Sequence, residues 1–347
     1  MDPKKFINIS TRKAFGHLKG CFKNKIGEAV STNDAIKRIL ICRPNHRLGN
    51  LLLLSPLVQE LESIFPNSEI DLLVNHSCAI QLYQNYENVN VVIAFPKKPF
   101  KSPIKYIKTF IRFRSKNYDL AINAVKESCT GRLFTSISKA KFKFVGNGIA
   151  DKKERHIAKQ VIYSFREFLP SIGVMPNDAV LANLDLRLAN EELIHGGSLV
   201  YDIVENAQPT ICLYTHTIDT KPYTEAWWLD LYAHLQKAFP DVNIIEMLPK
   251  ENSSKIGSKA PVLYSNDVRE LAAMIANTDV FVGADSGVMH LASSSLTPTI
   301  GLFSATDTKK YRPYNEGSLA VNINEVEIDA LIAVVKKTLY PNLNTSA

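Results

Sequence analysis

Residues 279–313 read DVFVGADSGVMHLASSSLTPTIGLFSATDTKKYRP, and this stretch decides how the chain folds. Its apolar run at 280–283 predicts a buried strand, and 299–303 predicts a second one. Between them, a turn of small residues precedes an expected helix over 288–295. Such a turn places free backbone N–H groups and the positive end of a helix dipole beside Ser286 and Gly287. The stretch therefore predicts a phosphate-binding turn, or else an ordinary strand–turn–helix of an α/β domain.

Length and composition indicate a globular protein of two domains. The chain has 347 residues, of which 46% are apolar and 22% charged, and this length suits two domains of roughly 150 residues. Its five cysteines are scattered without CxxC spacing, so we expect neither disulfides nor a metal site. We find no run as long as a membrane span and no signal-peptide core at the N-terminus. These features predict a cytoplasmic location.

Apolar strands alternate with helical segments along both halves of the chain. In the first half, the expected strands are 38–42, 69–74, 89–93, 120–123 and 142–145, with helices over 50–65 and 77–86. In the second half, strands at 210–214 and 243–247 precede those of the opening stretch, and helices are expected at 225–239, 267–277 and 325–339. This alternation predicts parallel, doubly wound sheets. The expected parts are a basic segment 1–35, α/β domains 36–205 and 206–325, and a C-terminal helix in 326–347 that could pack back on the first domain.

The motifs of the opening stretch resemble those of a known family. DSGxxHLA at 285–292, TPTxxLF at 297–303 and YxP at 311–313 resemble the donor-site signature of glycosyltransferase family 9, the lipopolysaccharide heptosyltransferases. The resemblance implies the GT-B fold, two Rossmann-like domains facing each other across a cleft. It also implies an inverting, metal-independent transfer without a cofactor, from a nucleotide sugar (ADP-heptose first) to a lipid-linked core sugar.

The expected donor residues lie in the second domain. LYTHTIDTK at 213–221 resembles the family's hydroxyl-rich turn, in which Thr217 and Lys221 would hold the donor pyrophosphate with Thr215 nearby. A lysine, hydroxyls and a helix N-terminus can offset the charge that grows on the leaving diphosphate. The other expected donor contacts are Glu246 (ribose hydroxyls), Asp285 (sugar or ribose, or a helix cap), Ser286, Gly287 and His290 (phosphate or sugar, or a buried structural residue).

The first strand ends in the turn RPNHRLGN at 43–50, where doubly wound folds bind ligands. Leu48-Gly49-Asn50 resembles the family's Leu/Met-Gly-Asp triplet, whose Asp is taken as the catalytic base. An amide cannot accept a proton, so three interpretations stay open. His46 is the base, or Asn50 orients the acceptor hydroxyl while another group takes the proton late, or catalysis has been lost.

The same turn offers acceptor contacts. Arg43 and Arg47 could each hold an anionic acceptor through bidentate contacts, or they could be ordinary surface charge. Gly49 belongs to the same expected acceptor site. If catalysis has been lost, the chain is a nucleotide-sugar-binding or scaffold protein of the same fold. An epimerase is a further alternative, which the lack of an acid pair among these site residues disfavours.

Two segments, 4–25 and 97–116, are basic and contain no acid. In the second, Ile104, Ile107, Phe110 and Ile111 fall near helical spacing, a pattern typical of a helix on an anionic membrane. A solvated basic face is the alternative, and nucleic acid is disfavoured because no recognised motif accompanies the charge. We therefore expect a protein at the cytoplasmic face of the inner membrane, with a nucleotide sugar, a lipid-linked oligosaccharide and the anionic membrane surface as partners.

Overall fold

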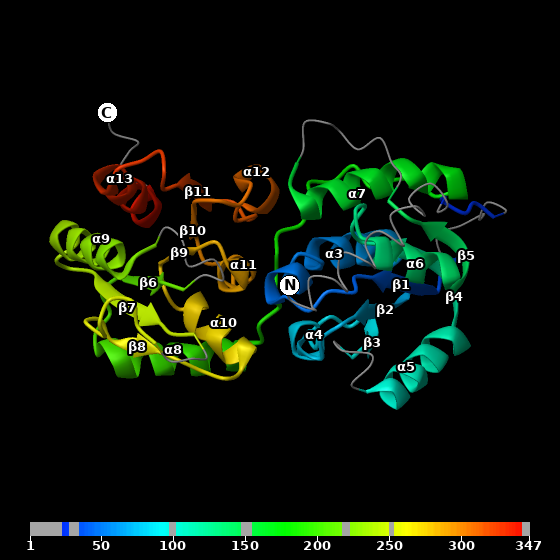
Figure 1. Ribbon diagram of the computed structural model, residues 1–347, viewed down its shortest axis with the longest axis horizontal. Helices are drawn as coiled ribbons and strands as arrows, with labels where there is room; N and C mark the ends of the chain where they lie inside the picture. Colours follow the sequence, from blue (N-terminus) through cyan, green and yellow to red (C-terminus); the bar gives the residue numbers. More distant parts are fainter. Residues whose placement is uncertain are drawn as a thin grey trace, which may run out of the picture. The chain divides into compact units, whose positions relative to one another are not determined.

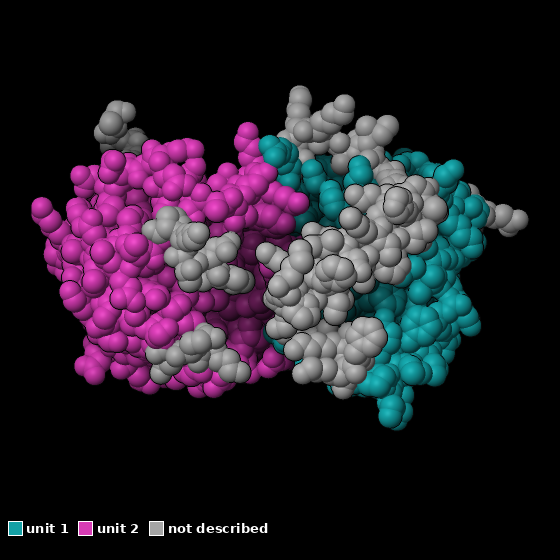
Figure 2. Space-filling view, in the orientation of Figure 1, with its two compact units in different colours: residues 1–46, 56–80, 86–182 teal, residues 47–55, 81–85, 183–347 magenta. Residues whose placement is uncertain are grey.

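The computed structural model describes residues 23–27, 35–96, 102–146, 155–216, 223–249 and 253–341. They form two compact units, each built on its own parallel sheet (Figures 1 and 2). Unit 1 comprises residues 1–46, 56–80 and 86–182, and unit 2 comprises residues 47–55, 81–85 and 183–347. Neither unit is a single continuous piece of the chain.

Unit 1 carries a sheet in the order β3-β2-β1-β4-β5. Its strands are β1 (Arg38–Cys42), β2 (Glu69–Val74), β3 (Val89–Ala94), β4 (Asn117–Asn123) and β5 (Lys139–Phe144), and all neighbours pair in parallel. The chain order reverses between β1 and β4, so the carboxyl ends of these two strands flank a topological switch point. The turn that begins at Arg43 follows β1 and lies at that point.

The helices of this half are α2 (Leu48–Leu52), α3 (Ser55–Ile64), α4 (Cys78–Leu82), α5 (Pro103–Ser115), α6 (Cys129–Ile137), α7 (Ile157–Phe168) and the short 3₁₀ helix η4 (Leu169–Ile172). The single helix expected over 50–65 is two helices. Proline lacks a backbone N–H and is tolerated only in the first turn of a helix. Pro56 therefore ends the first helix and stands in the first turn of α3.

Unit 2 carries a sheet in the order β11-β10-β9-β6-β7-β8. Its strands are β6 (Thr210–Tyr214), β7 (Asn243–Met247), β8 (Val262–Leu263), β9 (Val280–Ala284), β10 (Thr299–Phe303) and β11 (Leu319–Asn322). Every residue of β6, β9 and β10 is buried, which explains their continuous apolar sequence. The helices are α8 (Asn190–Val204), α9 (Glu225–Ala238), α10 (Val268–Ala276), α11 (Gly287–Ser294), α12 (Thr308–Tyr311) and α13 (Ile328–Leu339).

Two parts of the chain differ from the expected domain plan. Helix α8 was expected before the boundary at 205, but it packs against α10 in unit 2, so closely that a Cβ on Gly196 would lie 2.4 Å from the carbonyl carbon of Ala273. Helix α13 lies in unit 2 and not on the first domain, because Leu331 and Val335 are buried in the core cluster of the second sheet. Each helix therefore packs in the unit that buries its inward-facing residues.

The two parallel sheets with alternating helices confirm the predicted pair of doubly wound domains. Within the described ranges, none of the helices combines the length and the apolar character that crossing a bilayer requires.

Candidate functional site

The expected donor residues gather at the carboxyl edge of the sheet in unit 2. Strand β6 lies between β7 and β9, and the register pairs Leu213 with Glu246 and Tyr214 with Gly283. Thr215 follows β6, and Asp285 follows β9. The chain order reverses between β6 and β9, which is where doubly wound sheets bind ligands. The fold thus brings together side chains that are far apart in sequence.

Glu246 is fully buried and organises this edge. Its carboxylate accepts hydrogen bonds from Thr215 Oγ1 at 2.8 Å, from Ser254 Oγ at 2.5 Å and from the backbone N of Lys255 at 3.3 Å. These bonds satisfy a buried charge, which would otherwise be costly. Glu246 therefore ties the turn after β6 to the loop around Ser254. Its contact with a ribose stays a prediction, and a ribose hydroxyl would compete with these donors.

Helix α11 begins directly after β9, as the opening stretch predicted. Ser286 is its N-cap residue, and the Ser286 side chain accepts a hydrogen bond from the backbone N of Met289 at 3.3 Å. Ser286, and not Asp285, is thus the cap. The remaining N–H groups of the first turn lie just beyond the carboxyl end of β9, beside the switch point, where they could receive an anion.

Asp285 lies near Tyr223, a residue that the sequence did not single out. The pKa of Tyr223 is raised to about 12 by burial and by the nearby Asp285 carboxylate, although a hydrogen bond with Ser304 opposes the shift. The hydroxyl therefore stays protonated at neutral pH, and it donates to the backbone oxygen of Leu302 at 2.9 Å. Tyr223 is thus bound to β10, close to the turn that Asp285 begins after β9.

The turn after β1 and the donor motif meet within unit 2. A Cβ on Gly49 would lie only 2.6 Å from Cδ2 of the buried His290 and 3.3 Å from Cα of Gly287. In turn, a Cβ on Gly287 would lie 3.1 Å from the backbone N of Gly49. Helices α2 and α11 can approach this closely because both positions are glycine. The sequence predicted both motifs but not their contact.

The remaining expected site residues fall in different places. Arg43 is buried at the end of β1, and its backbone N donates to the oxygen of Leu73 at 2.8 Å. His46 is exposed and belongs to unit 1, whereas the exposed Arg47 and the partly buried Asn50 belong to unit 2. Arg47 is the N-cap residue of α2, without a side-chain capping bond. Thr217 and Lys221 lie outside the described residues.

Comparison with known proteins finds a family domain in the second half of the chain. Residues 210–340 match the sequence model of glycosyltransferase family 9 (heptosyltransferase). This part of the chain is therefore a glycosyltransferase family 9 domain. Lipopolysaccharide heptosyltransferase 3 of Escherichia coli is 24% identical over 302 residues, which cover 78% of this chain and 85% of that protein.

Solved structures agree with the fold. The family 9 glycosyl transferase of Veillonella parvula superposes with a TM-score of 0.69 at 17% identity, over 88% of this chain and 97% of that one. E. coli heptosyltransferase WaaC with ADP gives a TM-score of 0.63 at 17% identity, over 87% and 99% of the two chains. These likenesses confirm the predicted GT-B fold class.

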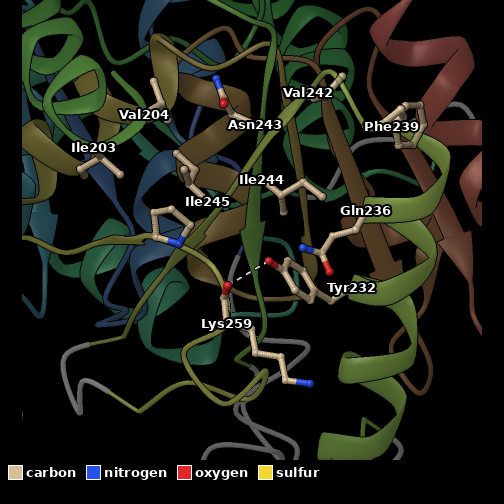
Figure 3. Close-up of a pocket in the computed structure, with 12 residues that line it drawn as sticks. Ile203, Val204, Tyr232, Gln236, Phe239, Val242, Asn243, Ile244, Ile245 and Lys259 are labelled. Carbon is tan, nitrogen blue, oxygen red and sulfur yellow. Dashed lines mark hydrogen bonds between the residues drawn. The ribbon is translucent and has the colours of Figure 1, made fainter. Parts of the chain in front are cut away.

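Unit 2 also has a cavity away from the expected donor residues. It measures about 400 Å³ and is lined by Tyr232, Lys259 and the first residues of β7 (Figure 3). Tyr232 Oη donates to the backbone oxygen of Lys259 at 3.0 Å across it. Asn243 lines the cavity and is the first residue of β7, so the cavity lies at the amino edge of the sheet. Parallel strands bind substrates at the opposite, carboxyl edge.

Sequence reasoning missed the residues that support the family 9 motifs. Ser254 hydrogen-bonds Glu246, and Tyr223 hydrogen-bonds β10 near Asp285, but neither residue belongs to a motif or a periodic pattern. Only the pairing of distant strands brings them to the site. Among the described residues, no group of three or more His, Cys, Asp and Glu side chains is arranged to hold a metal ion.

Proposed function

We propose that this glycosyltransferase moves a sugar, with heptose first, from a nucleoside-diphosphate donor to a lipid-linked lipopolysaccharide core acceptor. The observation that carries the proposal is the contact of Gly49 with Gly287 and His290, which joins the acceptor-side turn to the donor motif at the switch point. Relatives support the choice of substrates. One is named lipopolysaccharide heptosyltransferase 3, and solved WaaC structures contain ADP and ADP-2-deoxy-2-fluoro heptose.

On the donor side, the diphosphate would bind at the N-terminus of α11 beside Ser286 and Gly287. Thr215, Thr217 and Lys221 would contact its oxygens from the turn after β6, and His290, Asp285 and Glu246 complete the proposed donor set. When the glycosidic bond breaks, the diphosphate oxygen keeps the electron pair. Helix N–H groups and a lysine would offset this charge. We therefore propose that the transfer proceeds without a divalent ion.

On the acceptor side, a sugar hydroxyl would attack the anomeric carbon from the face opposite the leaving diphosphate, which inverts the configuration. Arg43 and Arg47 would hold an anionic group of the acceptor beside Gly49. In one version His46 takes the hydroxyl proton. In the other, the Asn50 amide orients the hydroxyl, and the proton leaves late to another group.

A second candidate follows from Asn50, which stands where the family motif has an acid. An amide there favours a protein that binds a nucleotide sugar without turning it over. Both candidates predict donor binding, so binding and turnover must be measured separately.

The test is a thermal melt against nucleotide sugars and free diphosphates, followed by release of the diphosphate in the presence of acceptor. A ligand at a hundred times its dissociation constant should raise the free energy of unfolding by about 2.7 kcal/mol. A shift with ADP-heptose together with acceptor-dependent ADP release supports the enzyme. A shift without release, even with acceptor, favours the binding protein. No shift with any donor refutes the proposed donor site.

An enzyme with a lipid-linked acceptor must work at a membrane surface. We accordingly propose that the protein acts at the cytoplasmic face of the inner membrane, attached from outside the bilayer, and that its basic segments contact anionic lipid and not nucleic acid.

A further inference from the structure

Helix α5 of unit 1 exposes a stripe of large apolar side chains. Ile104, Ile107 and Ile111 are 70%, 57% and 60% exposed. Their spacing of three and four residues places them on one face of the helix. Figure 1 shows α5 on the outside of unit 1. Single exposed apolar residues are common, but three adjacent isoleucines on one exposed helix face suggest an interaction surface.

The stripe is not needed to hold α5 on the protein, because another face does so. Tyr106, Phe110 and Phe113 turn inward to a cluster that contains Phe95 and Phe134. Ring centroids lie 5.0 Å apart for Phe95 and Tyr106 and 5.5 Å apart for Phe113 and Phe134. Phe110, which the sequence placed with the isoleucines, packs on this inner side. Helix α5 thus has an anchored aromatic face and a separate aliphatic face.

Cations lie along one side of the isoleucine stripe. Lys105, Lys108 and Arg112 are all exposed. Helical geometry places them together on the flank of the helix next to the stripe. Residues 97–116 contain eight Lys and Arg and no acid. Two of these cations have other partners, since Arg114 donates to the backbone oxygen of Ile137 and Lys116 pairs with Asp71 at 2.6 Å.

The isoleucines and cations of this face together fit only one of three possible binding partners. Nucleic acid would use the cations but would leave the isoleucines in water. A second copy of α5 would cover the isoleucines but would bring like charges together. An anionic bilayer satisfies both, because its interface takes up aliphatic side chains while its phosphates neutralise the cations. The hollow beside the first two turns, lined by Ser102, Pro103, Ile104, Lys105, Lys108 and Thr109, leaves room for a headgroup.

We propose that α5 lies on an anionic bilayer, with Ile104, Ile107 and Ile111 inserted and with Lys105, Lys108 and Arg112 on lipid phosphates. The inference rests on the proposed function for its setting, because a lipid-linked acceptor requires an enzyme at the membrane. It deepens that function by naming the element that binds the bilayer.

The test is co-sedimentation of the full chain with vesicles of phosphatidylcholine, alone or mixed with phosphatidylglycerol. The wild type should bind the mixed vesicles, and binding should weaken at high salt. The variant Ile104→Ser/Ile107→Ser/Ile111→Ser should bind at least about tenfold more weakly. Lys105→Gln/Lys108→Gln/Arg112→Gln should also bind more weakly. The matched control Ile194→Ser, on the 74% exposed Ile194 of α8, should bind like the wild type.

Two results would overturn the inference: mixed-vesicle binding that survives the triple serine change, and equal binding of the wild type to both kinds of vesicle. The substituted side chains are exposed, so the melting temperature should be unchanged, and a melt of each variant checks this. An ADP melt on the same variants separates the two proposals. Vesicle binding with no shift from ADP or from any other nucleotide or nucleotide sugar would refute the donor site and leave the α5 inference standing. An ADP shift without vesicle binding would support the donor site and refute the α5 inference.

Discussion

Gly49 and Gly287 let α2 and α11 approach each other because neither residue has a side chain. Each glycine faces the other's helix at a distance that no Cβ could occupy unchanged, and His290 fills the space beside them. The sequence placed Gly287 in a predicted phosphate-binding turn. In the structure, the backbone that approaches is that of α2. The donor motif thus also positions the turn that carries Asn50.

Replacing Gly49 with alanine should therefore disturb this contact. The added Cβ would overlap His290 Cδ2, at 2.6 Å, and overpacking of this kind costs about 1–3 kcal/mol. Urea unfolding of Gly49→Ala measures the loss. In Gly49→Ala/His290→Ala the overlap is gone, so the double variant should lose less than the sum of the singles. Gly27→Ala, where the nearest atom would be 3.4 Å away, is the control. Strict additivity would contradict the predicted overlap.

His46 offers a second prediction at this scale. If its imidazole takes the proton of the acceptor hydroxyl, His46→Ala and His46→Gln should each lower kcat by about 10²-fold or more. His195→Gln, at an exposed histidine of α8, should leave kcat unchanged. Near-wild-type rates in both His46 variants would exclude the base role and favour Asn50 as an orienting group.

At the scale of elements, Arg269 of α10 joins segments that the sequence did not connect. Its guanidinium is buried and binds both oxygens of Glu192 on α8, at 2.5 and 2.6 Å. It also donates to the backbone oxygens of Gln81, Leu186 and Arg187 at 3.0–3.2 Å. The bidentate pair and the three carbonyl acceptors together use all the N–H donors of the Arg269 guanidinium. This explains why residues 81–85 belong to unit 2.

Arg269→Ala should be strongly destabilising. It removes the charged partner of Glu192 and the donor of three carbonyl oxygens, and breaking a buried ion pair costs about 3–5 kcal/mol. Chemical unfolding measures the change. Lys255→Ala provides the control, because its bridge to Glu225 at 3.2 Å is exposed and such pairs contribute about 0–1 kcal/mol. Equal losses in the two variants would show that burial of the Arg269 pair has no special effect.

The same pair predicts an acid sensitivity. Hydrogen bonds from Arg269 are the largest cause that lowers the pKa of Glu192 from its ordinary 4.5, against the opposing effect of burial. A carboxyl with a lowered folded-state pKa adds stability that is complete above its unfolded pKa and is lost as pH falls through the folded value. Unfolding of the wild type should thus become easier below pH 4.5 more steeply than that of Glu192→Gln. Identical pH profiles would refute the assignment.

At the scale of the whole molecule, the two units are not the two halves of the chain. Unit 2 takes residues 47–55 and 81–85 from within the first half, and it begins at 183. The short segments carry the Gly49 contact and the Gln81 oxygen. A domain boundary drawn at 205 therefore cuts through packed structure, since α8 and the partner of Arg269 lie before it.

Truncation tests this plan. A fragment 206–347 loses α8 and Glu192, which uncovers Arg269 and the surface of α10 on which α8 packs. It should therefore melt at a lower temperature and less cooperatively than 183–347. The fragment 183–347 should gain stability from an added peptide of residues 47–55, because that segment packs on α11. Circular dichroism melts of both fragments measure the melting temperature and the cooperativity. Equal cooperative melting would support the boundary at 205.

Local pattern determined much of this protein. The strands at 38–42, 69–74, 210–214, 243–247 and 299–303 were predicted to the residue, because buried parallel strands are apolar throughout and are bounded by turn residues. The helix expected over 267–277 was equally visible, and Asp267 caps it by accepting from the backbone N of Arg269 at 2.7 Å. So was the strand, turn and helix around Ser286, since each depends on neighbours in sequence.

Only the tertiary structure decided what depends on distant partners. Helix α6 and the short strands β8 and β11 were not predicted, because packing stabilises them more than their own pattern does. The division of α5 into an aromatic and an aliphatic face, the burial of Glu246 under Ser254, and the Arg269 pair all require residues from separate elements. The sequence determined the elements and their family motifs. Packing between elements decided the unit boundaries and the contact of Gly49 with His290, because a contact depends on two surfaces and a local pattern describes only one.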